Sequence, residues 1–173
     1  IHVTGALEGA VPLNAEQYAA LHDGRAAPGL DQACRGIRID HIGDRRSGPL
    51  QDYGIAGTLS FEMSANFWRF GPENDTDQNL VLAVSPVLTY SLGKVFDNEL
   101  LAEFGIGVSL LDDTTFAGKN VSTHYQFEDR LGLIYRLSQE DSISLRYLHY
   151  SNAGFKKPNP GLDFIALGYS RAF

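Results

Sequence analysis

The sequence has very little cysteine, because Cys34 is the single one among its 173 residues. An intrachain disulfide and a cysteine-based metal site are therefore excluded, and no metal site is expected. Positive charge is also scarce: 14 Lys and Arg residues stand against 21 Asp and Glu residues, which gives a net charge of −7. Without a basic stripe, nucleic acid is excluded as the main partner.

Long hydrophobic runs are missing as well. No window of 18 consecutive apolar residues occurs, which excludes a transmembrane helix. It does not exclude membrane-spanning strands, whose apolar residues alternate with polar ones and give a much weaker signal per segment.

What the sequence does contain is a period of two. In the segment 141–151 every second residue is apolar through the middle, while the residues between them are largely polar. This pattern is typical of a strand with one apolar face. The apolar face carries Ile143, Leu145, Tyr147, His149 and Ser151.

The same alternation predicts eight strands, at 1–9, 34–43, 53–68, 79–92, 98–111, 121–137, 141–151 and 161–173. The connections alternate in length. Shorter ones are expected at 43–52, 93–97 and 138–140, and longer polar ones at 10–33, 69–78, 112–120 and 152–160. This indicates an all-β fold, an eight-stranded antiparallel up-and-down barrel. Residues 1–173 form one domain, in which 10–33 is an enlarged first outer loop that holds either a short helix at 15–24 or ordinary turns.

The polar faces of these strands mix acidic and basic residues with small ones. Charges of both signs can pair inside a narrow lumen, where they need partners. The apolar faces would then contact lipid, as in a transmembrane β-barrel, although a soluble barrel or sandwich remains the alternative. The charged residues of the polar faces are Glu62, Glu103, Glu128, Arg130, Arg136 and Arg146.

Three reactive residues interrupt the apolar faces near the loop 152–160. His149 and Ser151 are two residues apart, so they point to the same side of a strand. Asp163 lies on the corresponding apolar face of the next strand, where alternate residues point the same way. A hairpin between the two strands would bring Asp163 to His149. In a catalytic triad, Ser151 would attack an ester carbonyl, His149 would act as base and Asp163 would orient the imidazole. The alternatives are polar residues at the headgroup level and, for Asp163, a turn residue after Pro160-Gly161.

Three segments carry a family resemblance. HYSNAGFKKPNPGLD (149–163) resembles the signature segment of the PagL-type lipid A 3-O-deacylases. YQFEDRLG (125–132) and EFGIGV (103–108) are similar to two further segments of that family. The likeness extends over roughly 50–173, is loose over 34–49, and returns in IHVTGALEG at the N-terminus. It implies an eight-stranded outer-membrane barrel whose active site faces the bilayer.

The resemblance also implies roles for individual residues. Ser151 would be the nucleophile and His149 the base, while Asp163 would take the place of an acid that is glutamate in the family. Aspartate is one methylene shorter, so its reach to His149 is left open. The residues implied as oxyanion donors or loop supports are Asn152, Gly154 and Asn159, and those implied to face the substrate are Phe127 and Asp129.

The expected function is that of a serine esterase in the bacterial outer membrane, without metal or cofactor. It would hydrolyse the 3-position acyl ester of lipid A through an acyl-enzyme. Its partners would be lipid A or lipopolysaccharide of the outer leaflet and membrane lipids, and a homodimer is left open. The alternatives are a non-catalytic small barrel, another lipid-modifying barrel such as a phospholipase or acyltransferase, and a soluble lipocalin-like carrier.

Overall fold

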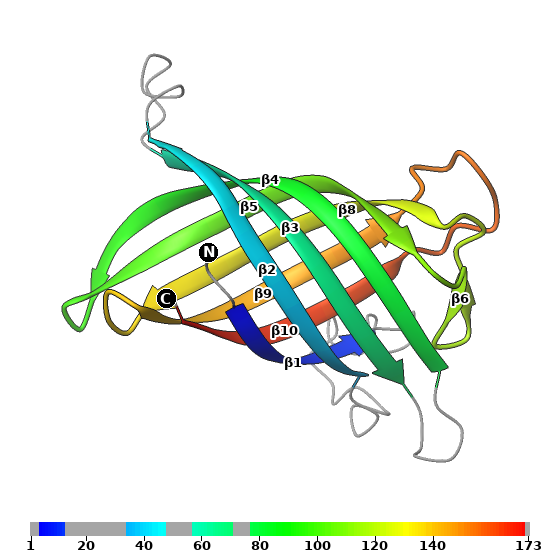
Figure 1. The fold of residues 1–173 in the computed structure, drawn as a ribbon, viewed down its shortest axis with the longest axis horizontal. Helices are drawn as coiled ribbons and strands as arrows, with labels where there is room; N and C mark the ends of the chain where they lie inside the picture. The colour runs from blue at the N-terminus through cyan, green and yellow to red at the C-terminus, as the bar shows by residue number, and fades with distance from the viewer. Residues whose placement is uncertain (1–3, 13–33, 48–56, 71–76, 172–173) are drawn as a thin grey trace, which may run out of the picture.

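Antiparallel strands close into a single barrel in the computed structural model, which describes residues 4–12, 34–47, 57–70 and 77–171 (Figure 1). Around the barrel the strands follow the order β1-β10-β9-β8-β5-β4-β3-β2, so that β1 and β10 close the sheet. The predicted eight-stranded up-and-down topology is confirmed. The strands are β1 (Thr4–Pro12), β2 (Cys34–Ser47), β3 (Gly57–Phe70), β4 (Asp77–Val95), β5 (Asn98–Leu111), β8 (Tyr125–Arg136), β9 (Asp141–Ser151) and β10 (Leu162–Arg171).

Several strand ends differ from the prediction. β1 continues to Pro12, so residues 10–12 belong to the wall instead of the first outer loop. The rest of that loop, with the candidate helix at 15–24, lies outside the described residues. β8 begins at Tyr125 instead of 121, because Ser122 has a positive φ of 64°, which interrupts an extended chain.

A short hairpin occupies the long connection between β5 and β8. It consists of β6 (Thr115–Phe116) and β7 (Lys119–Asn120), which pair with each other outside the main sheet. It lies at the same end of the barrel as the loop 152–160 (Figure 1). We refer to this as the loop end, and to the opposite end as the turn end.

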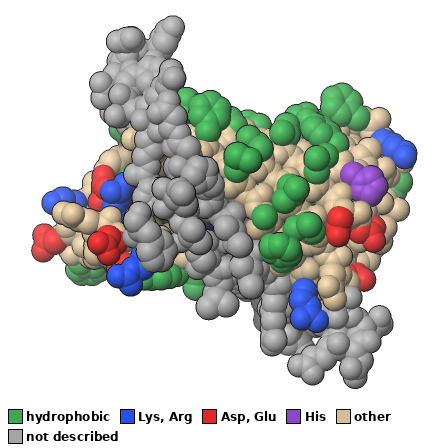
Figure 2. Space-filling model, viewed as in Figure 1, with side chains coloured by type: hydrophobic (Ala, Val, Ile, Leu, Met, Phe, Trp, Pro, Cys, Tyr) green, Lys and Arg blue, Asp and Glu red, His purple; other side chains and the backbone are tan. Residues whose placement is uncertain are grey.

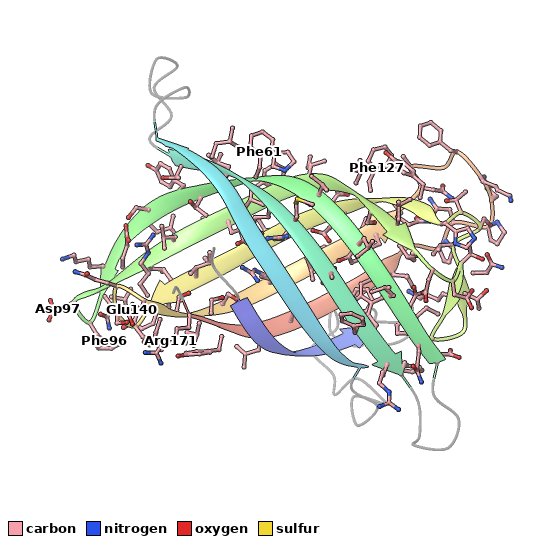
Figure 3. All side chains as sticks on the ribbon, viewed as in Figure 1. Phe61, Phe96, Asp97, Phe127, Glu140 and Arg171 are labelled. Atoms are coloured by element: carbon pink, nitrogen blue, oxygen red, sulfur yellow. The ribbon has the colours of Figure 1, made fainter. Side chains whose placement is uncertain are left out.

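A tight turn joins β4 to β5 at the turn end. Phe96 and Asp97 connect β4 to β5 with φ angles of 49° and 68°. Positive φ at both central residues is the geometry of a type I′ turn, which matches the twist of the flanking strands. The predicted connection 93–97 therefore shortens to two residues. Phe96 and Asp97 extend beyond the sheet there, near Glu140 and Arg171 (Figure 3).

The outer surface of the wall is apolar. Hydrophobic side chains cover the visible wall between ends where charged groups gather (Figure 2). No helix within the described residues is long and apolar enough to cross a membrane. A soluble barrel keeps its large apolar side chains inside. This wall exposes them along its length, which suits contact with lipid. The exposed hydrophobic residues include Phe61, Met63, Phe67, Leu82, Val84, Phe104, Ile106, Val108, Leu110, Leu131, Leu133, Leu145, Ile165 and Leu167.

The interior of the barrel holds paired charges, as the sequence predicts. Arg130 contacts Glu62 at 2.6 Å and Glu128 at 3.0 Å, and all three side chains are buried. Arg146 donates from Nε and Nη2 to the two oxygens of Glu103, at 2.8 and 3.1 Å. Such pairing is required because an unpartnered charge is costly to bury.

Arg136 is a correction to this prediction. Its side chain is 47% exposed and pairs with Glu99 at 3.2 Å instead of joining the buried network. It is the last residue of β8, so its inward parity places it at the rim of the turn end, where water reaches it.

Near the loop end the interior becomes apolar. Trp68, Tyr150 and Phe164 stack around one another, with ring centroids 4.9 Å and 4.5 Å from Trp68. Phe116 of the β6–β7 hairpin enters this cluster and is 1% exposed. Val121, which the sequence places on an outward strand face, is buried in the same cluster because it precedes β8. The hairpin therefore adds a buried aromatic side chain to the apolar cluster at the loop end.

Candidate active site

Three neighbouring strands position the predicted triad on the outside of the wall. In the register of β8, β9 and β10, His149 lies between Asp129 on one side and Asp163 on the other. Ser151 is opposite Phe127 of β8. All of these have the outward parity, as the sequence predicts, because the residues between them are buried in the lumen. Asp163 belongs to β10, so the alternative of a turn residue is wrong.

His149 and Asp163 form a close polar contact on the outer wall. His149 Nδ1 lies 2.7 Å from Asp163 Oδ1. The shorter aspartate therefore reaches the imidazole, because the two residues are direct cross-strand neighbours. With Nδ1 engaged by the carboxylate, Nε2 is the nitrogen that can exchange a proton with a nucleophile.

Ser151 follows His149 on the same face, at the last residue of β9. Its side chain is partly buried, and among the described residues no hydrogen bond joins its Oγ to His149. Nucleophile and base are often further apart before a substrate binds, and tighten in the reacting complex. The arrangement thus provides two members of the triad in contact and the third on the same side of the wall.

Two further groups approach Asp163. Tyr147 Oη donates to Oδ1 at 2.6 Å. From the loop end, Lys119 Nζ lies 4.0 Å from Oδ2 and donates to the carbonyl of Gly161 at 3.3 Å. Burial lowers the pKa of Lys119, and the carboxylate of Asp163 partly opposes this effect. The β6–β7 hairpin thus contributes a cation to the acid of the pair.

The loop that follows Ser151 is organised by Asn152, which is 1% exposed. Its Oδ1 accepts from Gly154 N at 2.9 Å and Lys156 N at 3.5 Å. Its Nδ2 donates to Val121 O at 3.0 Å and Lys156 O at 2.9 Å. Its backbone N donates to Asn159 Oδ1 at 3.3 Å. These contacts favour the loop-support role for Asn152, Gly154 and Asn159 over the role of oxyanion donor.

Aromatic side chains flank Ser151 on the outer surface. Phe127 packs edge-on against Tyr125, with ring centroids 5.3 Å apart, and lies 6.3 Å from Phe155 of the loop. Phe155 is 78% exposed. Phe127 projects outward at the loop end of the wall (Figure 3). An apolar surface next to Ser151 suits the binding of an apolar chain.

Sequence reasoning missed two neighbours of the triad. Lys119 was in a connection read as a polar loop, and no local pattern relates it to Asp163. The sequence does place Tyr147 on the outward face. Its position two residues before His149 on that face is the signal that could have predicted a contact between its hydroxyl and the Asp163 carboxylate. Within the described residues, no group of three or more His, Cys, Asp or Glu side chains is arranged to hold a metal.

Comparison with known proteins identifies relatives. The family model described as "Lipid A 3-O-deacylase (PagL)" matches residues 36–172. Lipid A deacylase PagL of Bordetella bronchiseptica is 35% identical over 115 residues, which cover 66% of this chain and 62% of that protein. Lipid A deacylase PagL of Pseudomonas aeruginosa is 33% identical over 103 residues, which cover 60% of this chain and 58% of that protein.

A solved structure supports the architecture. It is described as "Crystal structure of the outer membrane enzyme PagL", and it aligns over 100% of both chains with a TM-score of 0.67 and 21% identity. At that identity the likeness establishes the barrel fold.

Proposed function

The chain belongs to the lipid A 3-O-deacylase (PagL) family, and on that premise we propose that it is an outer-membrane esterase that removes the 3-position acyl chain of lipid A. The observation that carries the proposal is the contact of 2.7 Å between His149 and Asp163 on the lipid-facing wall. Polar groups in contact with lipid are energetically costly. A polar pair that is kept on this wall therefore indicates a function.

The chemistry begins with Ser151. Its Oγ attacks the ester carbonyl carbon, and its proton passes to Nε2 of His149. Asp163 holds the imidazole through Nδ1 and stabilises the imidazolium that forms. The tetrahedral intermediate collapses, the sugar hydroxyl at position 3 leaves with the proton from His149, and the acyl chain remains as an ester on Ser151.

Water completes the cycle. His149 removes a proton from a water molecule, which attacks the acyl-enzyme carbonyl. The Ser151–acyl bond breaks, Ser151 regains its proton, and a free fatty acid leaves into the bilayer. No redox step and no co-reactant besides water is needed.

The substrate would lie along the wall with its headgroup at the loop end. Lipid A occupies the outer leaflet, so its acyl chains would lie against the apolar outer surface of the wall. Phe127 and Phe155 offer a surface for the chain that is cleaved, while Asp129 faces the substrate beside His149. The aromatic side chains at this level are those that outer-membrane barrels commonly place at an interface.

The experiment that tests this proposal is mass spectrometry of lipid A and a palmitate-containing phospholipid, incubated together with the purified chain in detergent micelles. Wild type should remove one hydroxyacyl chain and release the matching fatty acid. Ser151→Ala should fold into the same barrel and release none. Loss of a phospholipid acyl chain would favour a phospholipase, a gain of palmitate would favour an acyltransferase, and an inactive wild type would favour a non-catalytic barrel.

A further inference from the structure

Tyr147 makes a contact that the triad chemistry does not use. Its hydroxyl donates to Asp163 Oδ1 at 2.6 Å, and the same oxygen lies 2.7 Å from His149 Nδ1. In the register, Tyr147 is opposite Ile165 and His149 is opposite Asp163. Tyr147 therefore reaches diagonally across the β9–β10 pair, a distance that a long aromatic side chain can span.

The carboxylate of Asp163 has a reason to need this second donor. It stands on the outer wall with its side chain 21% exposed, so the lumen network cannot hold it. Without Tyr147, the imidazole at Oδ1 and the more distant Lys119 ammonium, 4.0 Å from Oδ2, would be left to hold a carboxylate whose terminal torsion is soft. A phenol that donates to the oxygen beside the imidazole restricts rotation about that torsion.

The tyrosine in turn is not explained by lipid contact alone. Its ring is 38% exposed on the wall, where a phenylalanine would serve equally well. A phenolic hydroxyl on an apolar surface requires a partner, and Asp163 provides one. The hydroxyl is thus directed at the acid of the pair.

We propose that Tyr147 is a positioning residue that fixes the carboxylate of Asp163 against His149, an inference that rests on the proposed esterase function. It acts through Asp163 and does not touch the reacting ester. Its hydroxyl therefore affects the rate of the chemical step, and has little effect on substrate binding.

The wall provides a matched control. Tyr169 of β10 donates to Asp141 Oδ1 in the same kind of tyrosine–aspartate pair, at the turn end. Tyr169 is 42% exposed, close to the 38% of Tyr147. Tyr147→Phe and Tyr169→Phe therefore each remove a phenolic hydroxyl from the outer surface, one from a donor to Asp163 and the other from a donor to Asp141.

The test compares kcat and KM for fatty-acid release from lipid A in detergent micelles. Rates are normalised to the folded fraction, which is read from the change in electrophoretic mobility on boiling. Tyr147→Phe should lower kcat about tenfold with KM nearly unchanged, because the loss of one hydrogen bond to a charged group corresponds to a rate change of about this size. Tyr169→Phe should match the wild type. Equal kcat values for the two variants would overturn the inference.

A double-mutant cycle separates positioning from a general structural effect. If Tyr147 acts through Asp163, adding Tyr147→Phe to Asp163→Ala should leave the residual rate unchanged. An additive loss would overturn the inference even if the single variant is slow. The proposed function fails separately, if wild type releases no fatty acid or Ser151→Ala still does.

Discussion

The imidazole of His149 lies directly over the α-carbon of Gly161. A Cβ atom at position 161 would be 2.7 Å from His149 Cε1, and Gly161 also has a positive φ of 69°. Gly161, which lies between the loop 152–160 and β10, therefore provides the space in which the ring turns toward Asp163. Glycine satisfies both the backbone and the steric requirement.

Gly161→Ala should displace the imidazole and reduce kcat for lipid A deacylation by at least tenfold. Gly154→Ala is the control, because Gly154 also has a positive φ, of 79°, but a Cβ there meets nothing within 4 Å. Both variants carry a similar backbone penalty, of about 1 kcal/mol. Steady-state kinetics of the two proteins, with circular dichroism to verify folding, checks this. Equal activity losses would show that the backbone matters and the ring contact does not.

Asn152→Ala should loosen the loop that follows the nucleophile. The substitution leaves the amides of Gly154 and Lys156 and the carbonyl of Val121 without their side-chain partners. We expect a loss of about 1–3 kcal/mol in unfolding free energy, measured by urea titration in micelles, together with a lower kcat. Asn159→Ala removes a single acceptor at 3.3 Å and should cost less. A smaller effect for Asn152→Ala than for Asn159→Ala would contradict the assigned role of Asn152.

Lys119 should make the activity depend on alkaline pH. Burial lowers the pKa of its ammonium group, so Lys119 becomes neutral at a lower pH than a solvated lysine, whose pKa is about 10.4. As the pH rises through the lowered pKa of Lys119, Asp163 loses the ammonium group 4.0 Å from its Oδ2, and with it a contact that helps to hold the carboxylate in place. The rate should therefore fall on the alkaline side in the wild type.

Lys119→Arg keeps its charge throughout the alkaline range in which a lysine titrates, and should retain activity further into that range. Lys156→Arg, in the exposed loop, is the control that should leave the profile unchanged. Rates are measured from pH 7 upward, with the Ser151→Ala signal subtracted for spontaneous ester hydrolysis. If the pH profiles of wild type and Lys119→Arg coincide, deprotonation of Lys119 does not cause the alkaline fall in rate.

Arg130→Met tests the interior charges. It leaves Glu62 and Glu128 buried without their guanidinium partner, and breaking a buried pair in this way costs about 3–5 kcal/mol. Arg136→Met removes an ion pair at the rim, where the side chain is 47% exposed, and should leave stability unchanged within error. Urea unfolding followed by tryptophan fluorescence is suitable, because Trp68 lies in the lumen. Equal midpoints would show that the buried network does not hold the barrel together.

The sequence predicts the wall well because the period of two records directly which side chains face lipid. His149, Ser151 and Asp163 were placed on the outer surface by parity alone, and the structure puts them there. The charges of the lumen were predicted for the same reason. Among the described side chains, parity fails where a strand ends or has not yet begun, as for Arg136 and Val121.

The loop end could not be predicted in this way. Phe116 and Lys119 sit in a polar, turn-rich connection, and their partners are remote in the sequence. The burial of Phe116 depends on Trp68 and Phe164, which come from strands on either side of the closed barrel. No local periodicity encodes such contacts, because they arise only when the strands have closed.

The filled interior also bears on where chemistry can take place. Arg130, Glu128 and Tyr150 are each within 1% of complete burial, and Phe116 is equally buried at the loop end. Side chains packed in this way leave no room for a solute among them. The described part of the lumen therefore serves as a solid support, and the proposed reaction is confined to the outer surface.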